Sequence, residues 1–172
     1  MTGHVADVEL PAKPSRSLAD LFTMSGVQQP ADSVGFLLWR VAHRHQREVD
    51  RVLVPLGLTH LQFAMLIQAA WLSRGNNSVL QIDLGRFSKV HPMQLSSILK
   101  VLEAKALIIR HRCSGPGRAK RITLTDAGVA ILGVALPRVK ELQSNFFGVD
   151  AAFGNDLCTR LRRVVAGWGE DE

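Results

Sequence analysis

The chain has 172 residues, of which 47% are hydrophobic and 21% charged, a composition typical of globular proteins and outside the disordered class. No apolar run approaches the roughly 20 residues of a membrane-spanning helix, and residues 1–30 lack the apolar stretch of a signal peptide. Two cysteines, Cys113 and Cys158, are too few for a disulfide framework, so we expect a reduced, cytoplasmic protein with no membrane partner.

The net charge of +6 is concentrated in one segment. Between Arg86 and Arg121, nine Lys and Arg residues stand against a single acid, Glu103, whereas the other 12 basic residues face 14 acidic ones. A focused basic surface suits a polyphosphate backbone, because each neutralised phosphate releases counterions. A solvated basic face explains the charge equally well, so the charge alone does not show that the protein binds nucleic acid.

Residues 1–32 are predicted to form an arm with one short helix. Residues 1–16 show no hydrophobic period. Ser17, followed three residues later by Asp20, has the spacing of a helix start, and this helix should end near Met24.

A long amphipathic helix is predicted from Ser33 to about Val54. Its apolar stripe at helical spacing comprises Leu38, Val41, Ala42, Val49, Val52, Leu53 and Leu56. Four arginines fall largely on the opposite side. A helix of this length indicates packing against more than one partner.

Three further helices are predicted next. The capping-box spacing of Thr59–Gln62 starts a helix that ends at Arg74. Ser78 is predicted to cap a short helix, and Pro92, favoured at a first helical position, begins another that ends near Lys105.

The period then changes from 3.6 residues to 2. Residues 107–112 and 120–124 are predicted strands joined by Gly115-Pro116-Gly117, which gives a hairpin with a basic tip. A second long helix is predicted over residues 126–147, and Asp150 is predicted to cap a last helix.

This order predicts a mainly α protein with a small β-hairpin wing, the winged helix-turn-helix. Such a fold suits DNA, because one helix enters the major groove and residues near its N-terminus reach base edges. Gln94 suits adenine, Ser96 and Ser97 suit either base type, and Met93 suits a thymine methyl. Each alone is more often an ordinary surface residue; together with the basic hairpin they favour DNA.

Three runs resemble the MarR family of winged helix-turn-helix transcriptional regulators: LGRFSKV at 84–90, LKVLEAKALI at 99–108 and ITLTDAG at 122–128. Gly57-Leu58-Thr59 matches as well, and the resemblance covers about residues 33–166. It implies a homodimer that binds a palindromic operator. It also implies that this homodimer releases the DNA when a small aromatic or anionic effector enters between the dimer region and the DNA-binding lobe.

The predicted elements and the resemblance together give a domain plan: an N-terminal arm over 1–32, a helical dimerisation region from 33–56 and 126–168, and a winged helix-turn-helix domain over 57–125. The predicted DNA contacts are Lys89, Pro92, Met93, Gln94, Ser96, Ser97, Lys100, Arg110, Arg112, Arg118 and Lys120.

Two positions depart from the family pattern. The usual Asp-x-Arg of the wing is replaced by Gly115-Pro116-Gly117-Arg118, so the acid that braces the wing is missing. Arg118 takes the place of the arginine that enters the minor groove. Ala106 stands where glycine is usual after the recognition helix.

Trp39, His43 and His45 are the candidate effector contacts. His45 falls within the apolar stripe of the first long helix, and a histidine on an apolar helix face is more often a hydrogen-bonded core or interface group. Redox sensing in the family uses a cysteine near the start of the first long helix. No cysteine lies there in this sequence, so a thiol switch is disfavoured. His43 and His45 face different sides of a helix, and no residue set has metal-ligand spacing.

The sequence therefore predicts a sequence-specific, double-stranded DNA-binding regulator, a repressor released by a small molecule. It carries no catalytic motif, and we expect no enzyme activity and no cofactor. The alternative is a winged helix that only binds other proteins.

Overall fold

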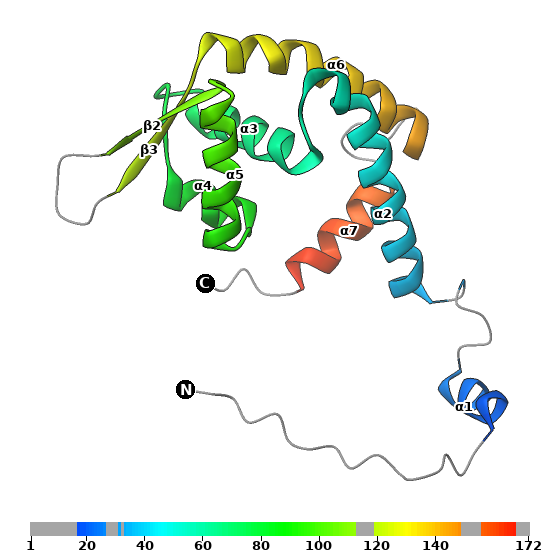
Figure 1. The fold of residues 1–172 in the computed structure, drawn as a ribbon. Coiled ribbons are helices and arrows are strands. Elements are labelled where there is room, and N and C mark those ends of the chain that lie inside the picture. Colours follow the sequence, from blue (N-terminus) through cyan, green and yellow to red (C-terminus); the bar gives the residue numbers. More distant parts are fainter. Residues whose placement is uncertain (1–16, 27–30, 32, 113–118, 149–155, 168–172) are drawn as a thin grey trace, which may run out of the picture. The chain divides into compact units, whose positions relative to one another are not determined.

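The computed structural model describes residues 17–26, 31, 33–112, 119–148 and 156–167 (Figure 1). The chain divides into two compact units, Met1–His43 and Arg44–Glu172. The described elements are mostly helices with one small antiparallel sheet, as the sequence predicts.

The first unit contains the short helix α1, Leu18–Ser25, and the first half of α2. A capping box starts α1: the Asp20 amide donates to Ser17 Oγ at 3.2 Å, and the Ser17 amide donates to the Asp20 carboxylate at 3.1 Å. Gly26 ends the helix in the left-handed conformation that glycine tolerates best. Residues 1–16 of the predicted arm lie outside the described residues.

The second unit begins within α2 (Val34–Leu53), which continues into the short 3₁₀ helix Val54–Leu56. The remaining elements are α3 (His60–Ser73), β1 (Val79–Leu80), α4 (Gln81–Ser88), α5 (Pro92–Ala104), β2 (Ile108–Arg112), β3 (Lys120–Leu124), α6 (Asp126–Phe147) and α7 (Asp156–Ala166). The predicted helix positions are confirmed, including the Thr59–Gln62 capping box of α3. Asp150, the predicted cap of the last helix, lies outside the described residues.

The sheet has a strand that the sequence did not predict. Val79–Leu80 pairs with β3, so the strand order is β1-β3-β2, and Val79 lies opposite Ile122. The prediction that Ser78 caps α4 is wrong, since Leu80 occupies that position and makes no side-chain cap. Ser78 Oγ instead accepts a hydrogen bond from Arg121 Nη1 at 3.0 Å. Burial of Val79 against the sheet accounts for the difference.

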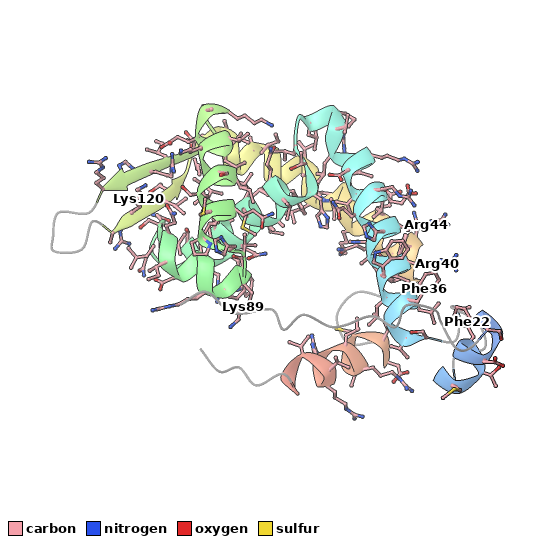
Figure 2. The ribbon with its side chains drawn as sticks, turned by 60° about the horizontal axis from the view of Figure 1, so that its bottom comes forward. Phe22, Phe36, Arg40, Arg44, Lys89 and Lys120 are labelled. Carbon is pink, nitrogen blue, oxygen red and sulfur yellow. The ribbon has the colours of Figure 1, made fainter. Side chains whose placement is uncertain are left out.

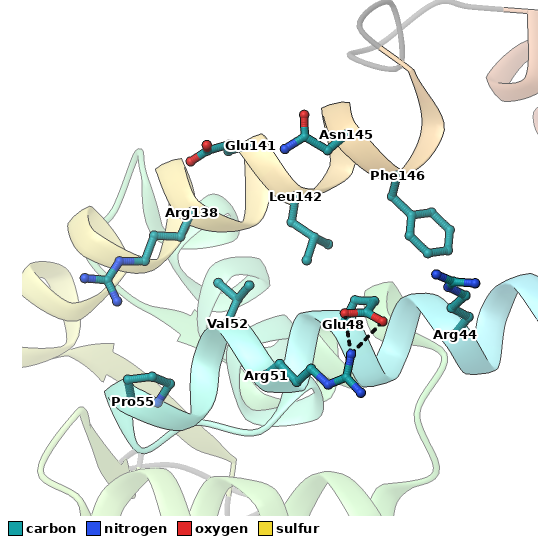
Figure 3. Close-up of a pocket in the computed structure, with 10 residues that line it drawn as sticks. All are labelled: Arg44, Glu48, Arg51, Val52, Pro55, Arg138, Glu141, Leu142, Asn145 and Phe146. Carbon is teal, nitrogen blue, oxygen red and sulfur yellow. Dashed lines mark hydrogen bonds and ion pairs between the residues drawn. The ribbon is translucent and has the colours of Figure 1, made fainter.

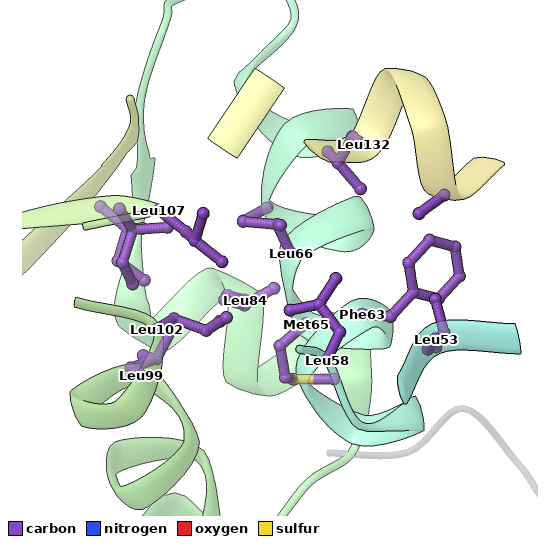
Figure 4. Packing of buried hydrophobic residues seen from close by; sticks show 14 of the residues in the cluster. Leu53, Leu58, Phe63, Met65, Leu66, Leu84, Leu99, Leu102, Leu107 and Leu132 are labelled. Atoms are coloured by element: carbon purple, nitrogen blue, oxygen red, sulfur yellow. The ribbon is translucent and has the colours of Figure 1, made fainter. Parts of the chain in front are cut away.

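One hydrophobic core joins the helices and the sheet of the second unit (Figure 4). Leu66 of α3 is fully buried at its centre. Leu84 of α4 and Leu99 of α5 pack there because each lies on the apolar side of its helix. Val49 and Leu53 of α2 and Leu132 of α6 join the same core, which ties both long helices to the winged domain.

The junction between hairpin and α6 is tightly hydrogen-bonded. The Thr125 amide donates to Leu107 O at 3.1 Å, and Thr125 Oγ1 accepts from the Gly128 amide at 3.0 Å. Gly128 lies so close to this turn that a Cβ placed on it would come within 2.1 Å of Leu107 O. The backbone therefore requires glycine here for space alone.

Ala106 has a left-handed backbone, with a φ of 55°. It follows α5 in a Schellman arrangement, in which the Leu107 amide donates to Leu102 O and the Ala106 amide donates to Glu103 O. Glycine is favoured at this point of the motif because a Cβ strains the left-handed conformation. The unusual alanine therefore carries backbone strain.

We expect Ala106→Gly to stabilise the protein by about 0.5–1 kcal/mol, because relief of a left-handed alanine, about 1–2 kcal/mol, exceeds the extra chain entropy of glycine. Thermal denaturation monitored by circular dichroism measures the change. Ala104→Gly, within α5, should instead lower the midpoint. A lower midpoint for Ala106→Gly would contradict the strain.

Among the described residues no single helix is long and apolar enough to cross a membrane. The two helices Val34–Leu56 and His60–Ser73, bent by 79° at their junction, pass that test only as a pair and only by length and composition.

Candidate nucleic-acid interface

Helix α5 presents a polar face beside a buried one. Leu95, Leu99 and Leu102 are buried, and their spacing leaves the opposite side open to solvent. Of the predicted base-edge and phosphate contacts on this helix, Pro92, Met93, Gln94, Ser97 and Lys100 are exposed and Ser96 is half-buried. The structure thus places these predicted contacts along one accessible helix face.

The N-terminus of α5 is capped by a residue that sequence reasoning missed. His91 Nδ1 accepts a hydrogen bond from the Met93 amide at 3.3 Å, and Pro92 occupies the first turn without needing a donor partner. Because a helix N-terminus carries partial positive charge, this end of α5 favours a phosphate.

A cleft of about 860 Å³ opens beside this helix end. Its apolar floor includes Ile82, Val90 and Leu95, and its cations are Arg86, Lys89 and Lys120. Figure 2 labels Lys89, which follows α4, and Lys120, which begins β3. Helix and wing therefore contribute cations to one surface, although they are about 30 residues apart in sequence.

Lys89 owes its position to an unusual backbone. It ends α4 with a φ of 52°, in the left-handed region. This conformation turns the chain sharply between α4 and α5, and it directs the turn of the helix-turn-helix toward the cleft.

Two cations of the basic segment, the predicted contact Arg110 and the neighbouring Lys105, are engaged within the protein. The Arg110 amide donates to Glu103 Oε1 at 3.1 Å, and the Arg110 guanidinium donates to Glu103 Oε2 through Nε at 2.9 Å and also through Nη2. The Arg110 side chain is only 13% exposed. Lys105 Nζ donates to Gly57 O and to Gln62 Oε1. Both side chains therefore stabilise contacts within the protein in this structure.

The Glu103–Arg110 pair joins the recognition helix to the first wing strand. The wing tip lacks the family's bracing acid, and Glu103 supplies an acid to β2 from α5. The Arg110 guanidinium holds the pKa of Glu103 below its ordinary value of 4.5. Sequence spacing gave no direct sign of this pair, since the two residues belong to different elements.

A lowered carboxyl pKa in the folded state means that the pair stabilises the wing above about pH 4.5 and that this stabilisation is lost as the pH falls through the folded pKa. We expect the Arg110 amide resonance to titrate with a midpoint below 4.5 in NMR spectra recorded against pH. Glu103→Gln should remove this titration. A midpoint at or above 4.5 would contradict the pairing.

The other predicted wing contacts are placed only in part. Arg112 and Lys120 are exposed and lie opposite each other as the last pair of the two strands before the connection between them. Arg118, expected to enter the minor groove, lies outside the described residues, as does Cys113.

The predicted effector residues do not line either described cleft. In the first unit, the exposed rings of Trp39 and His43 pack at 4.7 Å. In the second, His45 is half-buried against His60, Phe146 and Phe147.

Burial, together with repulsion from His60, lowers the pKa of His45. Within the described residues, His45 Nε2 is buried and has no hydrogen-bond partner. The expectation of a hydrogen-bonded core histidine is therefore not met at this atom. The described residues also contain no cluster of three or more metal-ligating side chains.

The fold and this surface together define a winged helix-turn-helix protein with a cationic reading face. No family model matches the chain. It is 33% identical over 118 residues to the uncharacterized HTH-type transcriptional regulator YdcH of Bacillus subtilis, covering 69% of this chain and 80% of that protein.

Two solved structures share the fold. CouR from Rhodococcus jostii, bound to p-coumaroyl-CoA, has a TM-score of 0.66 and 25% identity over 80% of this chain and 92% of its own. The Mycobacterium tuberculosis regulator MOSR, in complex with DNA, has a TM-score of 0.61 and 29% identity over 80% and 94%. The chain belongs to the MarR family and is a DNA-binding transcriptional regulator.

Proposed function

We propose that the protein is a homodimeric, sequence-specific repressor of transcription that binds a palindromic operator. The observation that carries this proposal is the convergence of the exposed face of α5, the cap at His91 and the cations Lys89 and Lys120 on one surface. The similar regulator MOSR, solved in complex with DNA, supports a duplex as the partner.

The proposed contact set is supported by the exposure of these side chains. Met93, Gln94 and Ser97 read base edges from the first turns of α5, while Lys89, Lys100 and Lys120 neutralise phosphates. Arg110 leaves the predicted set, because it is held by Glu103. Ser97 Oγ donates to Met93 O at 3.0 Å, so its hydroxyl oxygen serves a base as an acceptor.

Dimerisation uses the predicted region 33–56 and 126–168. The first half of α2 exposes Leu37, Leu38 and Val41, which match the predicted apolar stripe only in part, and α7 exposes Leu157 and Leu161. Single protomers rarely leave so many large apolar side chains on helices in water. A symmetric dimer places two recognition helices in successive major grooves, with half-sites about 10 base pairs apart.

The proposal assigns a cytoplasmic location and no reaction, cofactor or metal to the chain. Repression follows from exclusion of polymerase at an occupied promoter. An effector that binds the DNA-free form more tightly releases the operator. CouR, which is similar in fold, was solved with p-coumaroyl-CoA, which supports a small-molecule effector here.

The test is binding of the purified protein to duplexes selected from genomic DNA, with affinity measured against salt. Log affinity should fall linearly with log salt, with a slope of about −0.9 for each neutralised phosphate. Analytical ultracentrifugation of the same sample should give a dimer. A monomer, or a protein without salt-dependent affinity for any selected duplex, would overturn the proposal and favour a winged helix that binds proteins.

A further inference from the structure

The second half of α2 joins the winged domain through one short segment, residues 54–59, which we call the α2–α3 connection. Val49 and Leu53, near the end of α2, are its buried residues, and the chain then passes through the 3₁₀ helix and Gly57 into α3. A cleft of about 640 Å³ separates part of α2 from α6 (Figure 3), so α6 leaves one side of α2 without close packing. The α2–α3 connection therefore governs the direction of α2 relative to the DNA-binding lobe.

The recognition helix holds this connection through the residue at its C-terminal end. Lys105 follows α5, and its Nζ donates to Gly57 O and, at 2.9 Å, to Gln62 Oε1. Gln62 Oε1 also accepts the Thr59 amide at 3.4 Å in the capping box that starts α3. A single ammonium group thus links the end of α5 to the α2–α3 connection and to the first turn of α3.

A carboxylate of α2 holds the start of α3 as well. The His60 amide, the first of α3, donates to Asp50 Oδ1 at 2.7 Å, and Asp50 is half-buried. A carboxylate suits this place because a helix N-terminus carries partial positive charge. The neighbouring Arg51 is paired with Glu48 at 2.9 Å (Figure 3), and among the described residues Asp50 makes no ion pair. The Asp50 carboxylate is therefore engaged by the start of α3.

Lys105 and Asp50 connect three helices in series: α5 to the start of α3, and the start of α3 to α2. The apolar core holds the same helices together, but hydrophobic packing is non-directional and permits small sliding movements between them. A hydrogen bond weakens steeply when its distance or angle changes, and one that involves a charged group is stronger than a neutral one. These two contacts therefore fix the orientation of α5 relative to α2.

We propose that Lys105 and Asp50 are positioning residues that set the distance between the two recognition helices of the dimer, and that they thereby select operators by the spacing of the half-sites. The exposed face of α5 reads each half-site, and the two contacts determine how far apart the half-sites lie. One base pair more or less moves a half-site by about 3.4 Å and rotates it by about 35°. A rigid connection penalises this change, whereas a loose connection accepts it.

This inference rests on the proposed function, because only a dimer on two half-sites has a spacing to select. The two positioning residues lie outside the reading surface. Lys105 follows Met93 by 12 residues, about 18 Å along α5, and neither Lys105 nor Asp50 lines the cleft beside the N-terminus of that helix. Removal of either contact should therefore leave recognition of a single half-site intact.

The test compares duplexes in which the two half-sites of the selected operator are centred about 8, 9, 10, 11 or 12 base pairs apart. Fluorescence anisotropy with the full-length protein should show one preferred spacing. Lys105→Met keeps the length of the side chain and removes the ammonium group, and Asp50→Leu keeps the approximate shape and removes the acceptor. Each should lower the penalty for a wrong spacing about tenfold, the factor that a charge-assisted hydrogen bond contributes.

Two variants serve as controls. Asp50→Asn retains an oxygen that accepts the His60 amide, so it should recover most of the spacing preference that Asp50→Leu loses. Lys140→Met removes the same charge as Lys105→Met from an exposed position of α6 and should keep the full preference. A duplex with one half-site should bind the unchanged protein and all four variants equally, a result that a loss of folding would not allow.

Lys105 is exposed, so Lys105→Met carries the test even if Asp50→Leu does not fold. An unchanged penalty in Lys105→Met would overturn the inference. An equal loss of affinity for the single half-site and for every spacing would also overturn it, because the contacts would then serve folding alone. Operator binding by the unchanged protein without a preferred spacing would overturn the inference and leave DNA binding in place. Absence of duplex binding by every protein would instead count against the proposed function.

Discussion

Gly128→Ala should destabilise the protein by about 3 kcal/mol, at the upper end of the cost of overpacking a tight core. The added Cβ would lie 2.1 Å from Leu107 O, well inside contact distance. That oxygen belongs to the backbone and accepts the Thr125 amide at 3.1 Å, so it cannot move without breaking the turn between β3 and α6. The substitution also pushes α6 away from the start of the wing.

Differential scanning calorimetry provides the measurement, and a midpoint lower by about 6–12 °C is expected for a domain of this size. Gly133→Ala is the matched control, because Gly133 lies in the same helix and a Cβ there meets no atom within 4 Å. It should be neutral or stabilising by up to about 1 kcal/mol, since alanine favours a helix interior. Equal midpoints for the two variants would show that the Leu107 turn adapts freely.

Gln94→Ala should reduce discrimination between operator and mutated operator at one base-pair position by about 1–3 kcal/mol, which is about 5- to 150-fold. Gln94 is exposed in the first turn of α5, where an amide side chain can pair with both polar groups of an adenine edge. Fluorescence anisotropy with duplexes changed at single positions measures the effect. The salt slope should stay unchanged, because no phosphate contact is lost.

Lys89→Gln should produce the opposite pattern. It should weaken binding to all duplexes alike and make the salt slope shallower by about 0.9, because one phosphate loses its cation. Lys140→Gln, which removes an exposed lysine from α6, should change neither property. If Gln94→Ala and Lys89→Gln lose specificity and salt dependence equally, the assignment of reading and anchoring roles is wrong.

The Glu103–Arg110 pair shows how a wing can lose its bracing acid and still be held. The acid comes from the recognition helix instead of the hairpin tip, and it forms hydrogen bonds with both the backbone and the guanidinium of β2. The orientation of the wing is therefore tied directly to the orientation of α5. A change in one is expected to move the other.

Local sequence determined the helices and the hairpin. Capping boxes at Ser17 and Thr59, Pro92 at a first helical turn and the change of period before Ile108 each act through neighbouring residues, so they can be read along the chain. The same applies to the exposed face of α5, because burial of Leu95, Leu99 and Leu102 fixes which side of the helix remains in solvent.

Only tertiary structure decided features that join distant segments. Val79–Leu80 is too short to show a strand period and becomes one because β3 supplies its hydrogen bonds. Arg110 has the composition of a DNA contact, yet a carboxylate from another element holds it inside the protein. Arg44 and Arg138 are 94 residues apart and share a cleft only because α2 and α6 pack together. Long-range pairing of this kind depends on three-dimensional proximity, which no local pattern encodes.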